Sequence, residues 1–229
     1  MGTSPAFGNW RRTKVLSKLP KGFRRPLVRR PNLVILAGPN GSGKSTVFER
    51  HLRKWSLPFV NRDVIAKGLD ADNPDKAALR ALRVASSQQR ELLKRRQGFV
   101  TESIRPDPDL IREAREVGYK TRVLFICLET PDMNMARVRN RVARGGHSVP
   151  PGAILARYDR AIASAVQAVQ QTEQLLIVDN SVKGRSPRLI ARFQDGEVVS
   201  LRRNVPGWAE RAFAESFEAF RANRRSKRK

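Results

Sequence analysis

The sequence predicts an α/β fold, with a mostly parallel sheet covered by helices on both faces. Short, uninterrupted apolar runs alternate along the chain with longer helical patterns, as they do in βαβ units. The first apolar run, residues 33–37, ends at a glycine-rich segment, which is typical of a strand buried on both faces. At 229 residues, the chain is long enough for one such domain with extensions.

The predicted elements follow this alternation in order. Further strands are predicted at residues 57–60, 99–101, 121–128 and 174–178. Prolines that follow capping residues mark several helix starts, and glycines mark helix ends. Helices are expected from residue 43 or 44 to about 54, from 73 to about 96, at 106–117, at 131–141, and from 150 or 151 to about 172.

An antiparallel hairpin is predicted near the C-terminal end of the sheet. Asp195-Gly196 separates two short runs, residues 189–193 and 197–201. Asp-Gly between such runs is a strong hairpin signal, because the tight turn needs positive φ angles. We expect this hairpin to form an edge of the sheet.

The positive charge is spread unevenly along the chain. The formal net charge is +25. Residues 1–31 carry nine Lys or Arg and no acid, and residues 202–229 carry nine Lys or Arg against three Glu. We therefore expect a basic extended arm over 1–31, a nucleotide-binding domain over 32–201, and a basic helix and tail over 202–229. The electrostatic field of this excess positive charge attracts polyanions in general and does not indicate which kind binds.

Composition also bears on compartment. No apolar run is long enough to span a membrane, so no membrane partner is expected, and the first residues lack the apolar centre of a signal peptide. A cytoplasmic location is the expectation. Cys127 is the single cysteine and lies in an apolar run, so we expect a buried strand residue rather than a disulfide or zinc ligand.

The strongest motif is a phosphate-binding loop. The segment from Gly38 to Ser45 matches G-x-x-x-x-G-K-[ST] at every fixed position and lies between a predicted strand and a predicted helix. Its backbone N–H groups and the helix N-terminus would bind the phosphates of ATP. Lys44 would reach the β- and γ-phosphates, and Ser45 would coordinate Mg²⁺. The predicted nucleotide-binding residues are Gly38, Pro39, Asn40, Gly41, Ser42, Gly43, Lys44, Ser45 and Thr46.

This motif predicts a P-loop NTPase or kinase fold, and the rest of the chain favours a kinase. The loop is similar to those of ABC-type ATPases, but no Leu-Ser-Gly-Gly-Gln-like segment follows it. No apolar run ends in Asp-Glu either, so a Walker B strand with a catalytic carboxylate is missing. The leading hypothesis is therefore not an ABC-type ATPase, in which ATP drives two domains to close as a dimer.

Two acids stand at the ends of predicted strands, where ligands bind in open α/β sheets. Asp63 follows the second strand and is the predicted base that accepts a proton from a substrate hydroxyl. Glu102 follows the third strand and would bind substrate hydroxyls or a water of the Mg²⁺ shell. For each acid, the alternative is an ordinary capping or surface carboxylate.

A run of arginines precedes Gly145-Gly146, where kinases of this architecture carry a lid over the phosphates. Arg141 and Arg144 are the predicted phosphate clamps, because arginine is always charged and can bridge two phosphate oxygens. Arg137 shares their helical spacing, whereas Arg139 points elsewhere and is expected to be solvated. The alternative is a solvated cationic face for the whole run. A mobile loop is expected around Gly145 and His147.

Taken together, these motifs resemble the zeta-toxin family of P-loop kinases. The resemblance rests on five segments in the same order, which cover roughly residues 32–182: residues 37–46, 61–66, 101–102, 137–150 and 178–181. It implies ATP-dependent phosphorylation of a hydroxyl of a UDP-activated amino sugar, such as UDP-N-acetylglucosamine. It also implies a separate antitoxin protein as a partner. Carried over by motif, Lys44 and Ser45 handle phosphates and Mg²⁺, Asp63 is the base and Glu102 binds the sugar. Arg141 and Arg144 hold the triphosphate, and Asn180 lies near the adenine.

Two features depart from this family. The glutamate motif reads Val-Thr-Glu-Ser-Ile, without a threonine-rich continuation, and both termini are strongly basic. The alternative hypothesis is therefore a nucleic-acid-directed kinase or a nucleic-acid-binding ATPase. In that hypothesis the basic termini bind the backbone, while Trp10, Phe23 and Trp208 stack on bases. A third interpretation treats these aromatic residues as core anchors.

Overall fold

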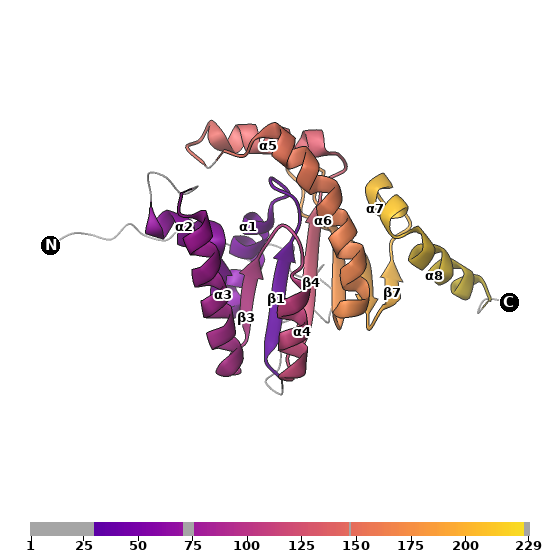
Figure 1. Cartoon of the computed structure of the whole chain (residues 1–229). Coiled ribbons are helices and arrows are strands. Elements are labelled where there is room, and N and C mark those ends of the chain that lie inside the picture. Colours follow the sequence, from indigo (N-terminus) through magenta and orange to yellow (C-terminus); the bar gives the residue numbers. More distant parts are fainter. Residues whose placement is uncertain (1–29, 71–75, 147, 227–229) are drawn as a thin grey trace.

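The computed structural model describes residues 30–70, 76–146 and 148–226. Within them, seven strands form one sheet in the order β2-β3-β1-β4-β5-β6-β7 (Figure 1). The pairs from β2 to β5 are parallel, and β6 pairs antiparallel with both β5 and β7. The strands are β1 (Asn32–Ala37), β2 (Phe59–Asn61), β3 (Phe99–Glu102), β4 (Lys120–Cys127), β5 (Gln174–Asp179), β6 (Arg188–Gln194) and β7 (Glu197–Leu201).

Helices alternate with the parallel strands, as the sequence predicts. Figure 1 shows α3, α4 and α6 on one face of the sheet, and α5 above the carboxyl ends of the strands. The helices are α1 (Lys44–Val47), α2 (Arg62–Leu69), α3 (Ala78–Lys94), α4 (Pro108–Glu116), α5 (Pro131–Val142), α6 (Pro151–Gln171), α7 (Gly207–Ala212) and α8 (Ala214–Ser226). A π-helical turn (η3, Phe48–Leu52) and a 3-10 turn (η4, Arg53–Trp55) continue α1.

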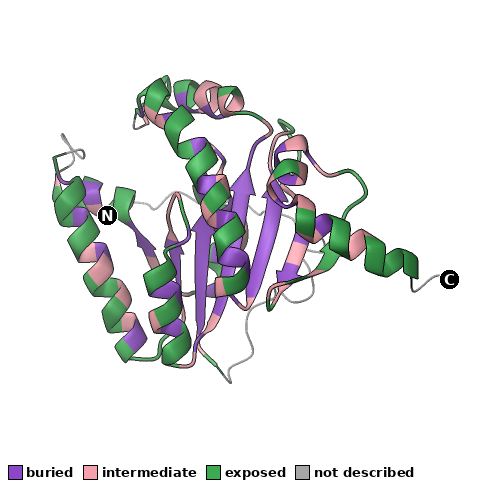
Figure 2. Cartoon of the chain, turned by 45° about the vertical axis from the view of Figure 1, so that its right-hand side comes forward, coloured by how far each residue is buried: buried purple, intermediate pink, exposed green. Residues whose placement is uncertain are grey.

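The core lies on both faces of the sheet, because alternate residues of each strand point to opposite sides. Leu33 and Ile35 of β1 join a cluster with α3, α4 and α6, while Val34 and Leu36 join a cluster with the α1 segment. All four side chains are at most 1% exposed. Figure 2 shows the parallel strands β1 to β5 buried along most of their length. The predicted parallel sheet with helices on both faces is therefore confirmed.

The edge hairpin is confirmed as well. Asp195 and Gly196 turn the chain between β6 and β7, and both have positive φ angles. Strand β7 ends the sheet on that side. Cys127 is fully buried in β4, as expected.

Two boundaries differ from the prediction. The strand predicted at residues 57–60 is β2 at Phe59–Asn61, and helix α2, which the sequence did not predict, begins directly after it at Arg62. The Asn61 side chain caps that helix by accepting hydrogen bonds from the N–H groups of Asp63 and Val64, at 2.8 and 3.2 Å. The predicted start of the next helix at residues 73–75 lies outside the described residues, and α3 begins at Ala78.

The C-terminal helices contribute to the core. Trp208, Phe213 and Phe217 are at most 2% exposed and belong to the same cluster as Phe125 of β4. Gly207 at the start of α7 donates its N–H to Glu129 Oε1 at 2.9 Å. Trp208 is therefore a core anchor, and the prediction that it stacks on nucleic-acid bases is wrong. Trp10 and Phe23 lie outside the described residues.

No helix in residues 30–70, 76–146 or 148–226 is long and apolar enough to cross a membrane.

Candidate active site

The phosphate-binding loop connects β1 to α1, in the context that its motif requires. Gly38 has φ +144°, and a Cβ atom there would lie 2.0 Å from the carbonyl oxygen of Ile126. Gly43 has φ +98°, and a Cβ atom there would lie 2.4 Å from Asn180 Nδ2. Side chains are therefore excluded at both positions, because the loop passes too close to β4 and to the end of β5.

Lys44 lies inside this loop. Its ammonium group donates to the carbonyl oxygens of Gly38 at 2.9 Å and Pro39 at 3.2 Å. Burial lowers the pKa of Lys44, and the nearby carboxylates of Glu102 and Asp63 oppose that shift. Lys44 is thus a desolvated cation, held where a phosphate would enter the loop.

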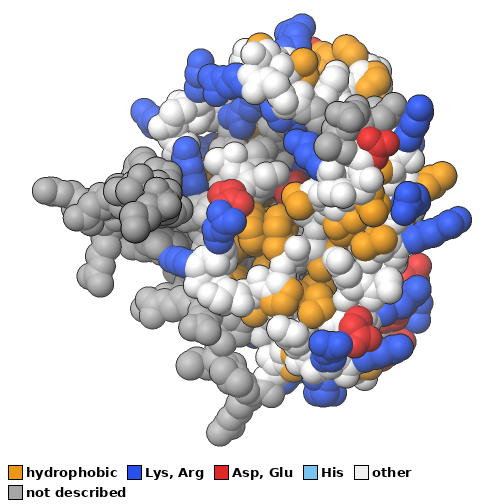
Figure 3. Space-filling model, turned by 90° about the vertical axis from the view of Figure 1, so that its left-hand side faces the viewer, with side chains coloured by type: hydrophobic (Ala, Val, Ile, Leu, Met, Phe, Trp, Pro, Cys, Tyr) orange, Lys and Arg blue, Asp and Glu red, His pale blue; other side chains and the backbone are white. Residues whose placement is uncertain are grey.

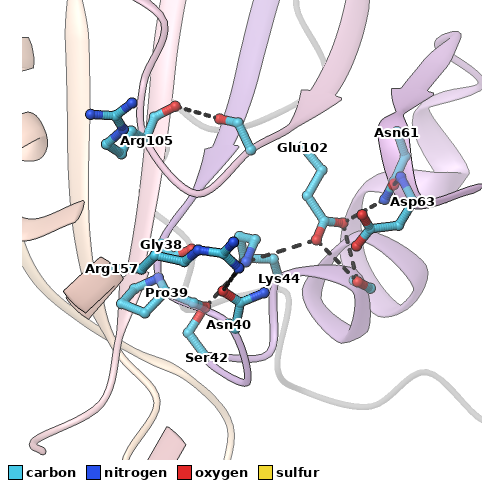
Figure 4. Close-up of polar contacts among 12 residues, drawn as sticks. Gly38, Pro39, Asn40, Ser42, Lys44, Asn61, Asp63, Glu102, Arg105 and Arg157 are labelled. Carbon is cyan, nitrogen blue, oxygen red and sulfur yellow. Dashed lines mark hydrogen bonds and ion pairs between the residues drawn. The ribbon is translucent and has the colours of Figure 1, made fainter. Parts of the chain in front are cut away.

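Glu102 reaches the loop from the carboxyl end of β3 (Figure 4). Its carboxylate accepts from Ser45 Oγ at 3.1 and 3.2 Å and from Asn61 Nδ2 at 2.9 Å. It also lies 3.9 Å from Lys44 Nζ. Burial raises the pKa of Glu102, although Lys44 and the Ser45 hydroxyl act in the opposite direction. The carboxylate therefore lies directly beside the hydroxyl that the motif assigns to Mg²⁺.

Asp63 lies in the first turn of α2, on the side of Glu102 that is away from Lys44 (Figure 4). It lines a cavity of about 260 Å³ together with Asn40, Lys44 and Glu102. Its side chain is exposed. The sequence predicts a role for each of Lys44, Asp63 and Glu102, which follow or end three different strands. The structure brings these three residues together.

The arginines before Gly145 differ in the contacts that their side chains make. Arg141 lies close enough to lower the pKa of Lys44, although burial is the larger cause of that shift. Arg137 donates to the carbonyl oxygen of Asn180 at 2.6 Å. Arg144 is exposed and, within the described parts of the chain, forms no hydrogen bond or ion pair through its side chain. The role of Arg144 as a phosphate clamp therefore stays a prediction. Helix α5 ends at Val142, and His147 lies outside the described residues.

Two side chains at the loop could not be found from the motifs. Asn134 of α5 is fully buried and donates from Nδ2 to the carbonyl oxygen of Asn40 at 2.6 Å. Arg157 of α6 lies 3.4 Å from Asn40 Oδ1 through Nη1 (Figure 4). The available signal for Arg157 is a polar stripe along the otherwise Ala-rich helix α6, which includes Arg160 and Ser164.

A second, larger cavity adjoins the smaller one. It measures about 570 Å³, lies between α3 and α6, and shares Arg62, Glu102 and Arg157 with the smaller cavity. Figure 3 views the side of the molecule on which α2 and α3 lie, where Lys and Arg side chains surround exposed hydrophobic ones. A volume of this size is sufficient for a small-molecule ligand.

Asn180 at the end of β5 holds the loop from the side opposite Glu102. Its Nδ2 donates to the carbonyl oxygen of Ser42 at 2.7 Å, and its backbone N–H donates to the Cys127 carbonyl at 2.9 Å. We predict that Asn180→Ala weakens ATP binding about tenfold, because the loop loses the hydrogen bond that fixes Ser42. Calorimetric titration with ATP measures this, and Asn204→Ala, an exposed position, is the control. Unchanged affinity in Asn180→Ala would contradict the positioning role.

Residues 33–165, more than half of the chain, match the model of a family described as an AAA domain. An uncharacterized protein of Haemophilus influenzae is 30% identical over 129 residues, which cover 55% of this chain and 91% of that protein. A chain of the AvrRxo1-ORF1:-ORF2 complex with ATP is similar in structure, with a TM-score of 0.61 at 14% identity. That match covers 82% of this chain and 64% of the other, so this chain spans less than two thirds of that relative.

A chain of the PezAT chromosomal toxin-antitoxin system of Streptococcus pneumoniae is also similar. Its TM-score is 0.52 at 13% identity, and the match covers 72% of this chain and 73% of that one. At these identities, both structures support the fold. The strand order and the phosphate-binding loop agree with a P-loop kinase fold. The chain therefore belongs to the AAA domain family, and its fold is that of the P-loop kinases.

Proposed function

We propose that this protein is an ATP-dependent kinase that phosphorylates a hydroxyl group of a small anionic acceptor. The acceptor proposed here is a UDP-activated amino sugar, as in the zeta-toxin kinases that the motifs resemble. One observation carries the proposal: Lys44, Asp63 and Glu102 line the smaller cavity beside the phosphate-binding loop, and Glu102 also lines the larger cavity between α3 and α6. ATP can thus bind on one side of the two carboxylates and an acceptor on the other.

The donor set suits Mg²⁺ bound together with ATP. The described residues contain no group of three or more His, Cys, Asp or Glu side chains that could hold a metal by themselves. Mg²⁺ in phosphoryl-transfer sites needs few protein ligands, because phosphate oxygens and water complete its shell. Ser45 Oγ and the adjacent Glu102 carboxylate fit that need, with Glu102 either beside the ion or holding one of its waters. The ion would neutralise charge on the transferred phosphate.

Asp63 is the proposed base. It is exposed in the smaller cavity, close enough to Lys44 and Glu102 to affect the pKa of both. Glu102 is already occupied by Ser45 and Asn61, so Asp63 is the freer carboxylate to accept the proton of an acceptor hydroxyl. Arg141 and Arg157 are the proposed clamps for the triphosphate, and Arg144 stays a proposed member of the lid.

The cavity between α3 and α6 is the proposed acceptor site. Its lining includes Arg62, Arg105, Arg157 and Arg160, against two acids, Glu102 and Asp107. The Asp107 carboxylate accepts the N–H groups of Asp109 and Leu110 as the cap of α4, and Glu102 faces the phosphate-binding loop. The lining therefore has excess positive charge, which favours an anionic acceptor.

The proposal is tested with Asp63→Asn. Wild type, incubated with ATP, Mg²⁺ and UDP-N-acetylglucosamine, is expected to yield a product that is one phosphate heavier by mass spectrometry. Asp63→Asn is expected to lower kcat by about two to four orders of magnitude, the usual contribution of a general base, with little change in ATP affinity. Asp70→Asn, beyond the last residue of the same helix, is the matched control. Equal kcat in wild type and Asp63→Asn would exclude Asp63 as the base.

An antitoxin is the proposed protein partner. Both similar structures named above come from two-component assemblies: AvrRxo1-ORF1 with ORF2, and a toxin-antitoxin system. This supports looking for a second protein that binds the kinase described here. A nucleic-acid acceptor is the less favoured alternative, since Trp208, which that hypothesis has stacking on bases, is buried in the core.

A further inference from the structure

Asn61 lies at the end of β2, next to both carboxylates of the candidate site. It is 6% exposed, and it is the register partner of Glu102 on the neighbouring parallel strand β3. Asp63 follows two residues later, in the first turn of α2. Figure 4 shows the Asn61 amide bonded to Glu102, with Asp63 beside it. A buried amide needs hydrogen-bond partners for both its oxygen and its nitrogen, and this one has them.

The two ends of this amide have different partners. Asn61 Oδ1 accepts from the N–H groups of Asp63 and Val64, at 2.8 and 3.2 Å, and so caps α2. Asn61 Nδ2 donates to Glu102 Oε2 at 2.9 Å. The amide cannot be turned over, because its nitrogen would then face the helix N–H groups and its oxygen would face a carboxylate. One planar group therefore connects the Glu102 carboxylate to the first turn of α2.

Helix capping alone does not explain an asparagine at this position. Serine, threonine and aspartate cap helices about as well. A serine or threonine hydroxyl that caps α2 would be too short to reach Glu102 as well. Aspartate has the shape of asparagine, but its second oxygen would lie against the Glu102 carboxylate as a like charge. The donor that asparagine adds therefore serves Glu102.

Other side chains hold the end of β2 in place. This strand is three residues long and lies at the edge of the sheet. Thr101 Oγ1 donates to the Val60 carbonyl at 3.0 Å, and Gln89 Nε2 of α3 donates to the same hydroxyl at 2.9 Å. These bonds fix β2 on β3 one residue before Asn61 meets Glu102. A short polar residue in place of Asn61 should therefore release the Glu102 carboxylate and leave the strand where it is.

We propose that Asn61 is a positioning residue for phosphoryl transfer. It keeps the Glu102 carboxylate beside Ser45 Oγ, where Mg²⁺ is proposed to bind with ATP, and it fixes Asp63 relative to that carboxylate through the first turn of α2. The bond from Asn61 to Glu102, at 2.9 Å, is shorter than those from Ser45, at 3.1 and 3.2 Å. This inference rests on the proposed function and adds a residue that acts through its two carboxylates.

Nucleotide binding tests the placement of Glu102 without turnover. Calorimetry titrates a non-hydrolysable ATP analogue into wild type, Asn61→Ser and Glu102→Gln, each in Mg²⁺ and in EDTA. Wild type is expected to bind the analogue about tenfold or more tightly in Mg²⁺. Asn61→Ser should lose most of that enhancement, as Glu102→Gln does, and should keep the metal-free affinity. Because serine still caps α2, its midpoint of thermal unfolding should lie within about 5 °C of wild type.

A double-mutant cycle tests the placement of Asp63. In wild type, Asn61→Ser is expected to lower kcat by about a hundredfold, the effect of displacing a reacting group by about 1 Å. In the Asp63→Asn background the same change should lower kcat little further, because residues that act as a unit are not additive. A purely structural role would lower kcat by the same factor in both backgrounds. Asp107→Ser, the same kind of exchange at the cap of α4, is the matched control for stability.

Three results would overturn the positioning role: no Mg²⁺ enhancement in wild type, the same enhancement in wild type and Asn61→Ser, or equal factors in both backgrounds of the cycle. Failure of the proposed function gives a different result. A wild type that does not bind the analogue at all refutes the kinase proposal and this role together. A wild type that binds it but transfers no phosphate refutes only the kinase proposal, and the Mg²⁺ titrations then decide the role of Asn61.

Discussion

Replacing Lys44 by methionine is expected to lower kcat/KM for phosphoryl transfer by about a thousandfold, or about 4 kcal/mol. The Lys44 side chain is 8% exposed, and its ammonium group is held against the Gly38 and Pro39 carbonyls, inside the turn of the loop. ATP phosphates would replace those weak partners with a direct ionic contact, in surroundings where burial has removed competing water. Methionine keeps most of the length of the side chain, which is unbranched like that of lysine, and removes the charge.

Calorimetry with ATP and initial-rate kinetics measure the effect, and Lys54→Met is the control. Lys54 is exposed on the turn that follows α1, so the same change in charge there should leave both quantities near wild type. Because burial lowers the pKa of Lys44, the folded protein gains little from its charge, and Lys44→Met should unfold at a temperature close to wild type. A Lys44→Met protein that binds ATP normally would contradict the role of the loop.

Trp208→Ala is expected to destabilise the fold by about 3 to 5 kcal/mol, the usual effect of removing a large buried aromatic side chain. Trp208 is 2% exposed, and its ring centroid lies 6.0 Å from that of Phe125 in β4. The substitution would leave a cavity between α7 and the sheet. Urea unfolding measures the free energy of unfolding.

Phe220→Ala is the matched control for that change. Phe220 lies on the outer part of α8, is only partly buried, and carries Arg224 over its ring at 5.7 Å. Its loss should change the free energy of unfolding by about 1 kcal/mol or less. If Trp208→Ala were equally mild, α7 and α8 would be an appended segment, as the basic composition of residues 202–229 suggested.

The sequence predicted the strands and the phosphate-binding loop well, because both depend on local patterns. Buried parallel strands require unbroken apolar runs, and the loop requires glycine where a Cβ atom would collide with β4 or Asn180. Helix α2 was missed because its apolar residues do not mark a buried face. Val64 is 62% exposed, whereas Ala66 is the residue that packs against α3.

The sequence could predict those residues of the candidate site that lie at the carboxyl end of a strand. Asp63 and Glu102 follow neighbouring strands, and parallel strands bring their carboxyl ends to one edge. Asn134 and Arg157 contact the loop from 94 and 117 residues away, so only the packing of α5 and α6 brings them there. Local spacing favoured Arg141 and Arg144 instead, and it cannot show which arginine of a helix faces the loop.

The most direct test of the kinase proposal follows the γ-phosphate of labelled ATP. In the presence of Mg²⁺ and UDP-N-acetylglucosamine, wild type is expected to transfer the label to the sugar nucleotide, with one label per acceptor, and Lys44→Met is expected to do so about a thousandfold more slowly. Release of all the label as inorganic phosphate, or its transfer only to RNA added in its place, would contradict a nucleotide-sugar kinase.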